Sequence, residues 1–326
     1  MKSLSLTFCA VLAALAAPGA ALAQAADWPP AQVSIVVPYP PGSEPDALAR
    51  DISHALSQKT GKTIVVENRP GANAIIGASH VARAPGDGST LLMIDRLALV
   101  TNPMLYSNVP YDWKTAFKPI TDIAEVQLYV AVNSKFPADD YRGFIEYARA
   151  NPGKVNVATG GNGHVNHIGM EMLARSEGVD FTYVPYKGTI PAMIDTVGGQ
   201  ADATMAGGMV MATNRANGGI KVLTTGGSIR HDLLSDVPTL EQAGGKPGSI
   251  PTTFFSLLAP AGVADETVQQ IRDMVVDVIQ EERLRTAYET RGLVIAGTQP
   301  ADMRAAMQKD EGRYREVIEA AGIQAN

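Results

Sequence analysis

The chain is poor in cysteine: its 326 residues include one, Cys9. Cys9 lies inside an apolar N-terminal stretch, away from the cleavage point at which a lipid-anchored exported protein carries its cysteine, so we interpret it as a free thiol. Once that stretch is removed, the mature chain holds no cysteine and forms no disulfide. Such a chain tolerates an oxidising compartment without depending on it.

The sequence also lacks an apolar run long enough to cross a membrane. The apolar stretch Leu4–Ala17 is shorter than the roughly 20 residues that a spanning helix needs. It follows Lys2 and precedes Ala21-Leu22-Ala23, a small-x-small pattern typical of signal-peptide cleavage. We therefore expect residues 1–23 to be a signal peptide, cleaved near Ala23, and the mature protein to be periplasmic.

There is no excess of basic residues. Lys and Arg number 27 against 33 Asp and Glu, which gives a formal net charge of -6. This balance argues against nucleic acids and anionic membrane surfaces as partners. A protein of this charge that binds anions must use local dipoles and a few placed groups.

The signatures of catalysis are missing too. No G-x-S-x-G, H-E-x-x-H or Walker pattern occurs, and no cysteine survives processing as a nucleophile. Gly161-Asn162-Gly163 is a fragment of a dinucleotide fingerprint, but Asn166 holds the third glycine position. We expect no enzyme, no catalytic residue and no cofactor. An exported hydrolase stays open as an alternative, because triads assemble from distant residues.

What the sequence does contain is an alternation of apolar strands and amphipathic helices, typical of an α/β fold with mostly parallel sheets. We expect two lobes, residues 24–126 plus 250–326 and residues 127–249, hinged by two crossing strands with a ligand cleft between them. The segment 95–122 has the composition of loops. The expected strands are 35–37, 63–67, 90–94, 124–132, 155–158, 181–184, 201–205, 221–225, 252–259 and 293–296, and the expected helices are 45–60, 75–82, 140–150, 164–177, 266–283, 284–291 and 300–321.

One loop in each expected lobe favours anion binding. In the first, a buried strand stops at Pro38, and Ser43 with Asp46 forms the S-x-x-D pattern of a capping box that opens a helix. Free N–H groups and the helix dipole at such a point attract negative charge. In the second lobe, Gly160 to His164 forms a glycine-rich loop before another helix. His164 and His167 have the spacing of two metal ligands, but they lack a strong third one, so ligand contact or local hydrogen bonding is the preferred interpretation.

Several motifs in order give the chain a family resemblance. It resembles the extracytoplasmic solute receptors of the tripartite tricarboxylate transporter system, often called Bug receptors. That resemblance implies a two-lobed, Venus-flytrap, type II-like periplasmic binding protein whose first loop grips a ligand carboxylate and whose second-lobe loop holds the other end. The motifs are 36–42 with Asp46, 66–72, 84–88, 102–106, 150–154, 184–188, 236–240 and 258–262.

Three departures from the family pattern bear on the ligand. Ser43-Glu44 replaces a loop glycine and its neighbour, Asp95-Arg96 replaces small hydroxylated residues, and Ala206-Gly207-Gly208 replaces Phe-Asp-Asn. Glu44 either points outward into solvent or meets an amino, amide or ring N–H group of the ligand. Arg96 can clamp a carboxylate, or Asp95 and Arg96 can pair with each other at the rim.

From these observations we expect a monomeric receptor that captures a small organic acid or acid derivative for membrane transporter subunits, without a bound metal. A role in signalling to a membrane sensor kinase is the alternative. The candidate ligand-binding residues are Tyr39, Gly42, Ser43, Glu44, Asp46, Asp95, Arg96, Gly161, Asn162, Gly163, His164, His167 and Tyr186.

Overall fold

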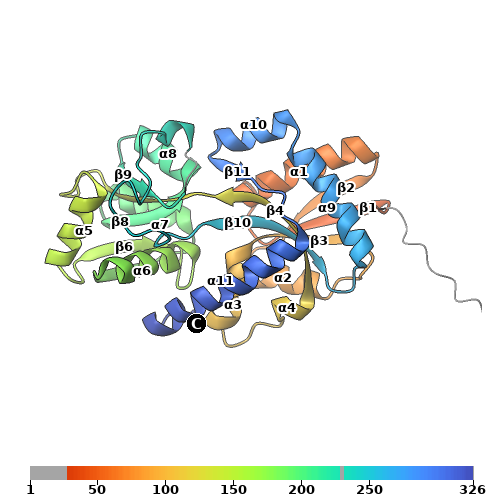
Figure 1. The fold of residues 1–326 in the computed structure, drawn as a ribbon, viewed down its shortest axis with the longest axis horizontal. Helices are drawn as coiled ribbons and strands as arrows, with labels where there is room; N and C mark the ends of the chain where they lie inside the picture. Colours follow the sequence, from red (N-terminus) through yellow and green to blue (C-terminus); the bar gives the residue numbers. More distant parts are fainter. Residues whose placement is uncertain (1–27, 228–230, 326) are drawn as a thin grey trace, which may run out of the picture.

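The computed structural model describes residues 28–227 and 231–325, which form two lobes, each built on its own β-sheet (Figure 1). The expected signal peptide, residues 1–23, lies outside the described residues. Within the described ranges, no helix combines the length and apolarity that a membrane crossing requires.

The first lobe contains a six-stranded sheet with the order β11-β4-β10-β3-β1-β2. Strand β1, between β3 and the edge strand β2, is nearly continuous in buried apolar residues, as expected for a strand covered by helices on both faces. The strands are β1 (Gln32–Val37), β2 (Thr63–Asn68), β3 (Thr90–Asp95), β4 (Phe117–Val126), β10 (Thr253–Pro260) and β11 (Leu293–Ile295). The helices are α1 (Glu44–Thr60), α2 (Ile75–Ala82), α3 (Arg96–Leu105), α4 (Trp113–Ala116), α9 (Asp265–Ile279), α10 (Glu282–Thr290) and α11 (Pro300–Ala321).

The second lobe contains a five-stranded sheet with the order β7-β6-β8-β5-β9. Strands β6 and β8 are parallel neighbours, so the loops that follow them leave the sheet at the same edge. The strands are β5 (Leu128–Asn133), β6 (Val155–Thr159), β7 (Phe181–Pro185), β8 (Ala203–Gly207) and β9 (Ile220–Thr225). The helices are α5 (Tyr141–Ala150), α6 (Val165–Glu177), α7 (Thr189–Gly198), α8 (Gly208–Ala216) and the short 3-10 helix η1 (Asp232–Leu234).

Two strands carry the chain between the lobes, as the sequence predicted. On the way out, only Gln127 separates β4, which pairs with β10 and β11, from β5, which pairs with β8 and β9. On the way back, β10 enters the first sheet (Figure 1). Helix α11 packs on α3 and β4 of the first lobe and also on α6 of the second. The expected residue limits of the lobes therefore stay a prediction.

Three details of the predicted fold are wrong. The sheets are mixed rather than mostly parallel, because β5, β10 and β11 pair antiparallel with their neighbours. The segment predicted as loops contains α3 and α4, since Asp95 caps α3 and Pro103 falls in its last turn. Helices α7 and α8 were missed because glycines flank them and obscure the helical pattern.

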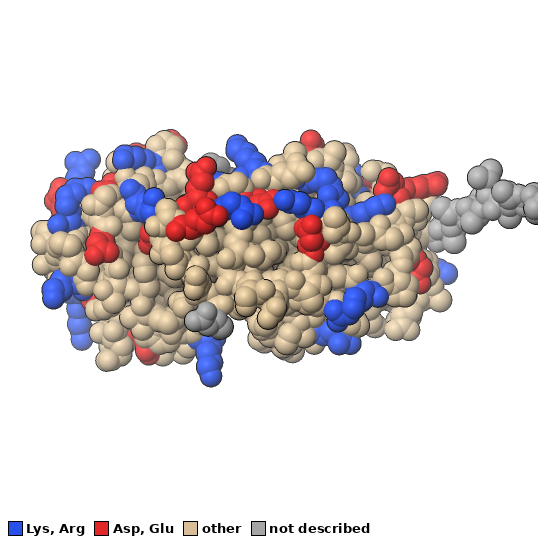
Figure 2. All heavy atoms as spheres, turned by 90° about the horizontal axis from the view of Figure 1, so that it is seen from below, with Lys and Arg blue, Asp and Glu red and all other residues tan. Residues whose placement is uncertain are grey.

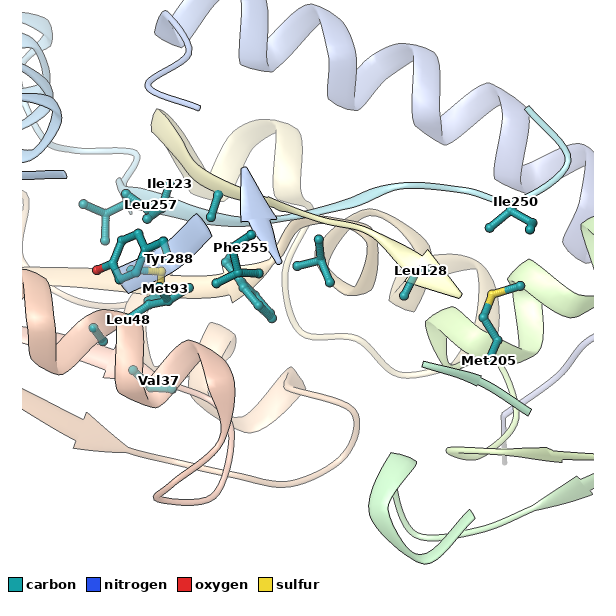
Figure 3. Close-up of a cluster of buried hydrophobic side chains, with 14 of the residues drawn as sticks. Val37, Leu48, Met93, Ile123, Leu128, Met205, Ile250, Phe255, Leu257 and Tyr288 are labelled. Carbon is teal, nitrogen blue, oxygen red and sulfur yellow. The ribbon is translucent and has the colours of Figure 1, made fainter. Parts of the chain in front are cut away.

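The main apolar core follows the crossing strands from one lobe into the other (Figure 3). Val37, Leu48 and Met93 belong to its first-lobe part, and Leu128 and Met205 belong to its second-lobe part. Because the crossing strands bury side chains along their length, the connection between the lobes is a packed element and not a bare linker. On the face shown in Figure 2, basic and acidic side chains are interspersed, in keeping with the small net charge.

Candidate functional site

Tyr39 ties together the carboxyl ends of three strands in the first lobe. It follows β1; its carbonyl accepts a hydrogen bond from Asn68 Nδ2 at the end of β2, and its hydroxyl accepts one from the Asp95 N–H at the end of β3. Burial, helped by the charge of Asp95, raises the pKa of Tyr39, so the phenol stays neutral. Tyr39 therefore shapes the edge of the sheet where ligands of such folds bind.

Asp46 closes the loop that precedes α1. Its carboxylate accepts hydrogen bonds from the Gly42 N–H at 2.8 Å, from Arg50 at 2.9 and 3.0 Å, and from Asn68 at 2.8 Å. Burial alone would raise the pKa of Asp46, but these donors lower it below its usual range. The carboxylate is fully occupied inside the protein, and Gly42 gives its N–H to Asp46.

The predicted capping box is not formed. Ser43 is the N-cap residue of α1, yet its side chain makes no capping hydrogen bond, and Asp46 turns back to Gly42 instead of Ser43. Ser43 Oγ is buried and, within the described ranges, has no hydrogen-bond partner. Buried hydroxyls are normally satisfied, so this one calls for a partner other than the described residues.

Glu44, the first residue of α1, does not point outward. A Cβ built on Gly207 would lie 3.9 Å from Glu44 Oε2, so the carboxyl group reaches the second lobe where β8 ends and α8 begins. Burial raises the pKa of Glu44 to about 7, and Arg291 opposes the shift. The side chain thus lies at the boundary between the lobes.

The second-lobe loop uses much of its hydrogen-bonding capacity internally. The Gly160 N–H donates to Asn166 Oδ1 at 2.9 Å, and the Gly163 N–H donates to His167 Nδ1 at 3.0 Å. His164 caps α6 by accepting from the Asn166 N–H. The anion-binding role that we predicted for this loop therefore depends on its other polar groups.

Burial keeps both histidines of this loop neutral. It lowers the pKa of His164, and it lowers that of His167 to about 4, where the neighbouring His164 contributes to the shift. Glu171, one helical turn after His167 on α6, accepts a hydrogen bond from the Tyr183 hydroxyl at 2.8 Å. No group of three His, Cys, Asp or Glu side chains in residues 28–227 and 231–325 gathers in the manner of a metal site.

Thr159, at the end of β6, was missed by the sequence analysis. Its side chain is fully buried, and its Oγ1 has no hydrogen-bond partner in the described parts of the chain. It directly precedes the glycine-rich loop of the second lobe, whereas Ser43 ends the first-lobe loop as the N-cap of α1. A hydroxylated residue at the end of a buried strand before Gly-Gly was the signal that could have identified it.

Two further candidate residues, Gly161 and Tyr186, form hydrogen bonds within the second lobe. The Gly161 carbonyl accepts from the His164 N–H at 3.1 Å, and Tyr186 donates its hydroxyl to Asp195 at 2.7 Å. Asn162 and His167 line a cavity of about 360 Å³ that the C-terminal residues 321–324 complete. A cavity of about 510 Å³ lies nearby, between residues 103–108 and the chain end.

Arg96 is already paired. Its guanidinium contacts Asp122 at 2.7 Å and Asp310 at 3.0 Å, lies 4.3 Å from the centre of the Phe254 ring, and is buried. Asp95 caps α3 at Leu97 and accepts a hydrogen bond from the Thr253 hydroxyl. The alternative of an Asp95–Arg96 ion pair at the rim is therefore not what forms. A direct clamp on a ligand remains a prediction, and the two buried carboxylates compete with it.

Comparisons with known proteins show the family and the fold to which this chain belongs. The family model "Tripartite tricarboxylate transporter family receptor" matches residues 48–323. The chain is 31% identical over 299 residues to the UPF0065 protein in the tcbD-tcbE intergenic region of Pseudomonas sp. strain P51, covering 92% of this chain and 89% of that protein.

Two solved structures share the fold at full length. Rpa4515 of R. palustris with adipate is 31% identical, with a TM-score of 0.82, over 91% of this chain and 99% of that one. MatC (Rpa3494) of Rhodopseudomonas palustris with bound malate is 27% identical, with a TM-score of 0.77, over 88% of this chain and 98% of that one. The fold is the two-lobed periplasmic binding protein fold that the sequence predicted, and this chain belongs to the tripartite tricarboxylate transporter receptor family.

Proposed function

We propose that this chain is a periplasmic receptor that binds a small carboxylated or carboxylate-derived metabolite between its lobes and delivers it to a tripartite tricarboxylate-type membrane transporter. One observation carries the proposal. Ser43 Oγ and Thr159 Oγ1 are both buried without a hydrogen-bond partner in the described ranges. Ser43 ends the first predicted binding loop as the N-cap of α1, and Thr159 ends the strand that precedes the second loop. A ligand with acceptor oxygens would satisfy both hydroxyls.

Membership of the receptor family supports transport as the purpose of binding. Rpa4515 is described with adipate and MatC with malate, which are small carboxylic acids. The names of these relatives indicate binding and not turnover, which favours a receptor over the exported hydrolase. The N-terminal pattern of residues 1–23 fits delivery to the periplasm.

A thermal-unfolding screen of the mature protein tests the proposal. The panel holds mono- and dicarboxylates, amino acids and pyridine carboxylates at millimolar concentration, with uncharged sugars as controls. A ligand at a hundred times its Kd adds about 2.7 kcal/mol of stability, which raises Tm by several degrees. The proposal fails if no carboxylate raises Tm more than the sugars do.

A further inference from the structure

Glu44 and Asp46 are acids two residues apart at the start of α1, yet among the described residues only Asp46 has hydrogen-bond partners. Asp46 accepts hydrogen bonds from Gly42, Arg50 and Asn68. In residues 28–227 and 231–325, the Glu44 carboxylate accepts no hydrogen bond and forms no ion pair, and Arg291 attracts it only from a greater distance. Asp46 therefore stabilises the loop of the first lobe, whereas Glu44 makes no polar contact among the described residues that would stabilise this lobe.

The Glu44 side chain extends toward the boundary between the lobes. Its Oε2 lies 3.9 Å from the position of a Cβ on Gly207, the N-cap residue of α8. Gly207 ends β8, the parallel neighbour of the strand that ends at the unpartnered Thr159. The carboxyl group thus stands beside Ser43 and reaches the strand ends of the other lobe that border the proposed binding site.

We propose that Glu44 determines the class of ligand: it disfavours dicarboxylates and selects a monocarboxylate that also carries an N–H donor, such as an amine or an amide. This inference rests on the proposed function. The Glu44 carboxyl group would lie where the second carboxylate of a dicarboxylate ligand would otherwise bind. An N–H donor on the ligand would instead form a hydrogen bond with the Glu44 oxygens.

Electrostatics gives the direction and an upper limit of the effect. If the second carboxylate of a ligand lay about 4 Å from an ionised Glu44, repulsion at a surface-like dielectric would lower the affinity of that ligand roughly a thousandfold. The positive end of the α8 dipole would attract both the Glu44 carboxylate and the ligand carboxylate. This attraction is much weaker than the repulsion between the two carboxylates, so it offsets only a small part of it. An ammonium or amide N–H at the same place gains from the carboxylate instead of being repelled.

Isothermal titration calorimetry with matched ligands tests the inference. Each set contains a diacid, its monoamide and the corresponding ω-amino acid, for example adipate, adipamate and 6-aminohexanoate, with chain lengths of three to six carbons. Measurements at pH 8 keep Glu44 ionised, because its pKa is about 7. We expect the wild type to bind the monoamide or amino acid at least tenfold more tightly than the matched diacid.

The variant Glu44→Gln keeps the shape of the side chain and removes its charge. We expect it to bind the diacid at least tenfold more tightly than the wild type does and to lose the preference for the ω-amino acid. Glu282→Gln, at an exposed position of α10, removes the same formal charge away from the lobe boundary and is the matched control. It is expected to keep the wild-type ranking.

The two proposals fail in different ways. If the wild type binds a diacid as tightly as its monoamide and Glu44→Gln leaves that ratio unchanged, the ligand-class inference is wrong and the receptor function stands. If neither the wild type nor Glu44→Gln binds any carboxylate of the sets, both proposals fall together.

Discussion

Gly163 of the second lobe packs directly against Leu105 of the first: a Cβ on Gly163 would lie 2.7 Å from Leu105 Cδ2. Gly163 also has a φ of +73°, a conformation that favours glycine. The added Cβ would meet the far end of the Leu105 side chain, so one of the two groups would have to shift. The positive φ favours glycine at this turn, and the contact with Leu105 favours a residue without a Cβ.

We predict that Gly163→Ala lowers ligand affinity at least tenfold, because the added methyl group separates the lobes at Leu105. The folded state should lose only about 1 kcal/mol from the backbone conformation. Calorimetric titration measures the affinity, and urea unfolding measures the stability. The double variant Gly163→Ala with Leu105→Ala is the control, since it makes room for the methyl group and should regain part of the affinity. An equal loss in both variants would contradict the steric explanation.

Substitution of Arg96 should act on stability before it acts on binding. Arg96→Met leaves Asp122, which is 2% exposed, as a buried carboxylate without its cation. Breaking a buried pair in this way costs about 3–5 kcal/mol, which urea unfolding of the ligand-free protein would detect. Arg96→Met combined with Asp122→Asn should recover part of the loss. A large drop in affinity at unchanged stability would instead support the sequence-based clamp.

The two unpartnered hydroxyls predict an unusual pair of variants. Because Ser43 Oγ and Thr159 Oγ1 form no hydrogen bond within the described chain, Ser43→Ala and Thr159→Val should leave the ligand-free protein as stable as the wild type or slightly more stable. Each should still weaken binding by about 0.5–1.5 kcal/mol, the usual net value of one hydrogen bond. Thr204→Val, which removes a bond to the Ala158 carbonyl, is the comparison that should cost stability.

Glu44 gives stability a pH dependence of defined sign. Its pKa is raised from 4.5 to about 7 by burial, so between these values the folded state holds a proton that the unfolded state has released. Stability from this group is complete below pH 4.5 and is lost as the pH rises through 7, by up to about 3 kcal/mol. When the free energy of unfolding is plotted against pH between 5 and 7, its slope should be more positive in Glu44→Gln than in the wild type, because the variant lacks this loss of stability. Identical slopes would show that Glu44 titrates normally.

His167 acts in the opposite direction. Burial lowers its pKa from 6.5 to about 4, so the unfolded state binds a proton in this range before the folded state does. Its contribution to stability is present above pH 6.5 and is lost as the pH falls toward 4. His167→Asn keeps an acceptor for the Gly163 N–H and removes the titration. Denaturation curves at pH 7 and pH 5 should therefore differ less in the variant than in the wild type.

Local sequence patterns were enough to predict the strand-turn-helix of residues 35–60 and the glycine-rich loop before α6, because turn residues and apolar periodicity act over a few positions. The crossing strands were also predictable, since a long apolar run had to leave the first lobe. The missed helices α7 and α8 show the limit of this approach. Glycines at their ends concealed a helical pattern that tertiary packing stabilises.

The partners of individual side chains were not predictable from spacing. Ser43 and Asp46 fit a capping box, but the fold places Gly42 and Arg50 within reach of Asp46, and Ser43 Oγ has no hydrogen-bond partner among the described residues. Arg96 seemed available to a ligand, but β4 and α11 bring Asp122 and Asp310 to it from 26 and 214 residues away along the chain.

The sequence by itself determined the family, the two-lobed α/β architecture and the two loops at which binding is proposed, because strand, turn and cap signals are local. Only the tertiary structure decided which polar groups in those loops remain free. Among the described residues, Ser43 Oγ and Thr159 Oγ1 have no hydrogen-bond partner, whereas Asp46, Arg96 and His167 have them. The physical reason is that a polar contact forms only where the folded backbone brings two groups within reach. Gly42 reaches Asp46 and Gly163 reaches His167 through the shape of a turn, whereas Asp122 and Asp310 reach Arg96 from distant segments that folding alone brings together.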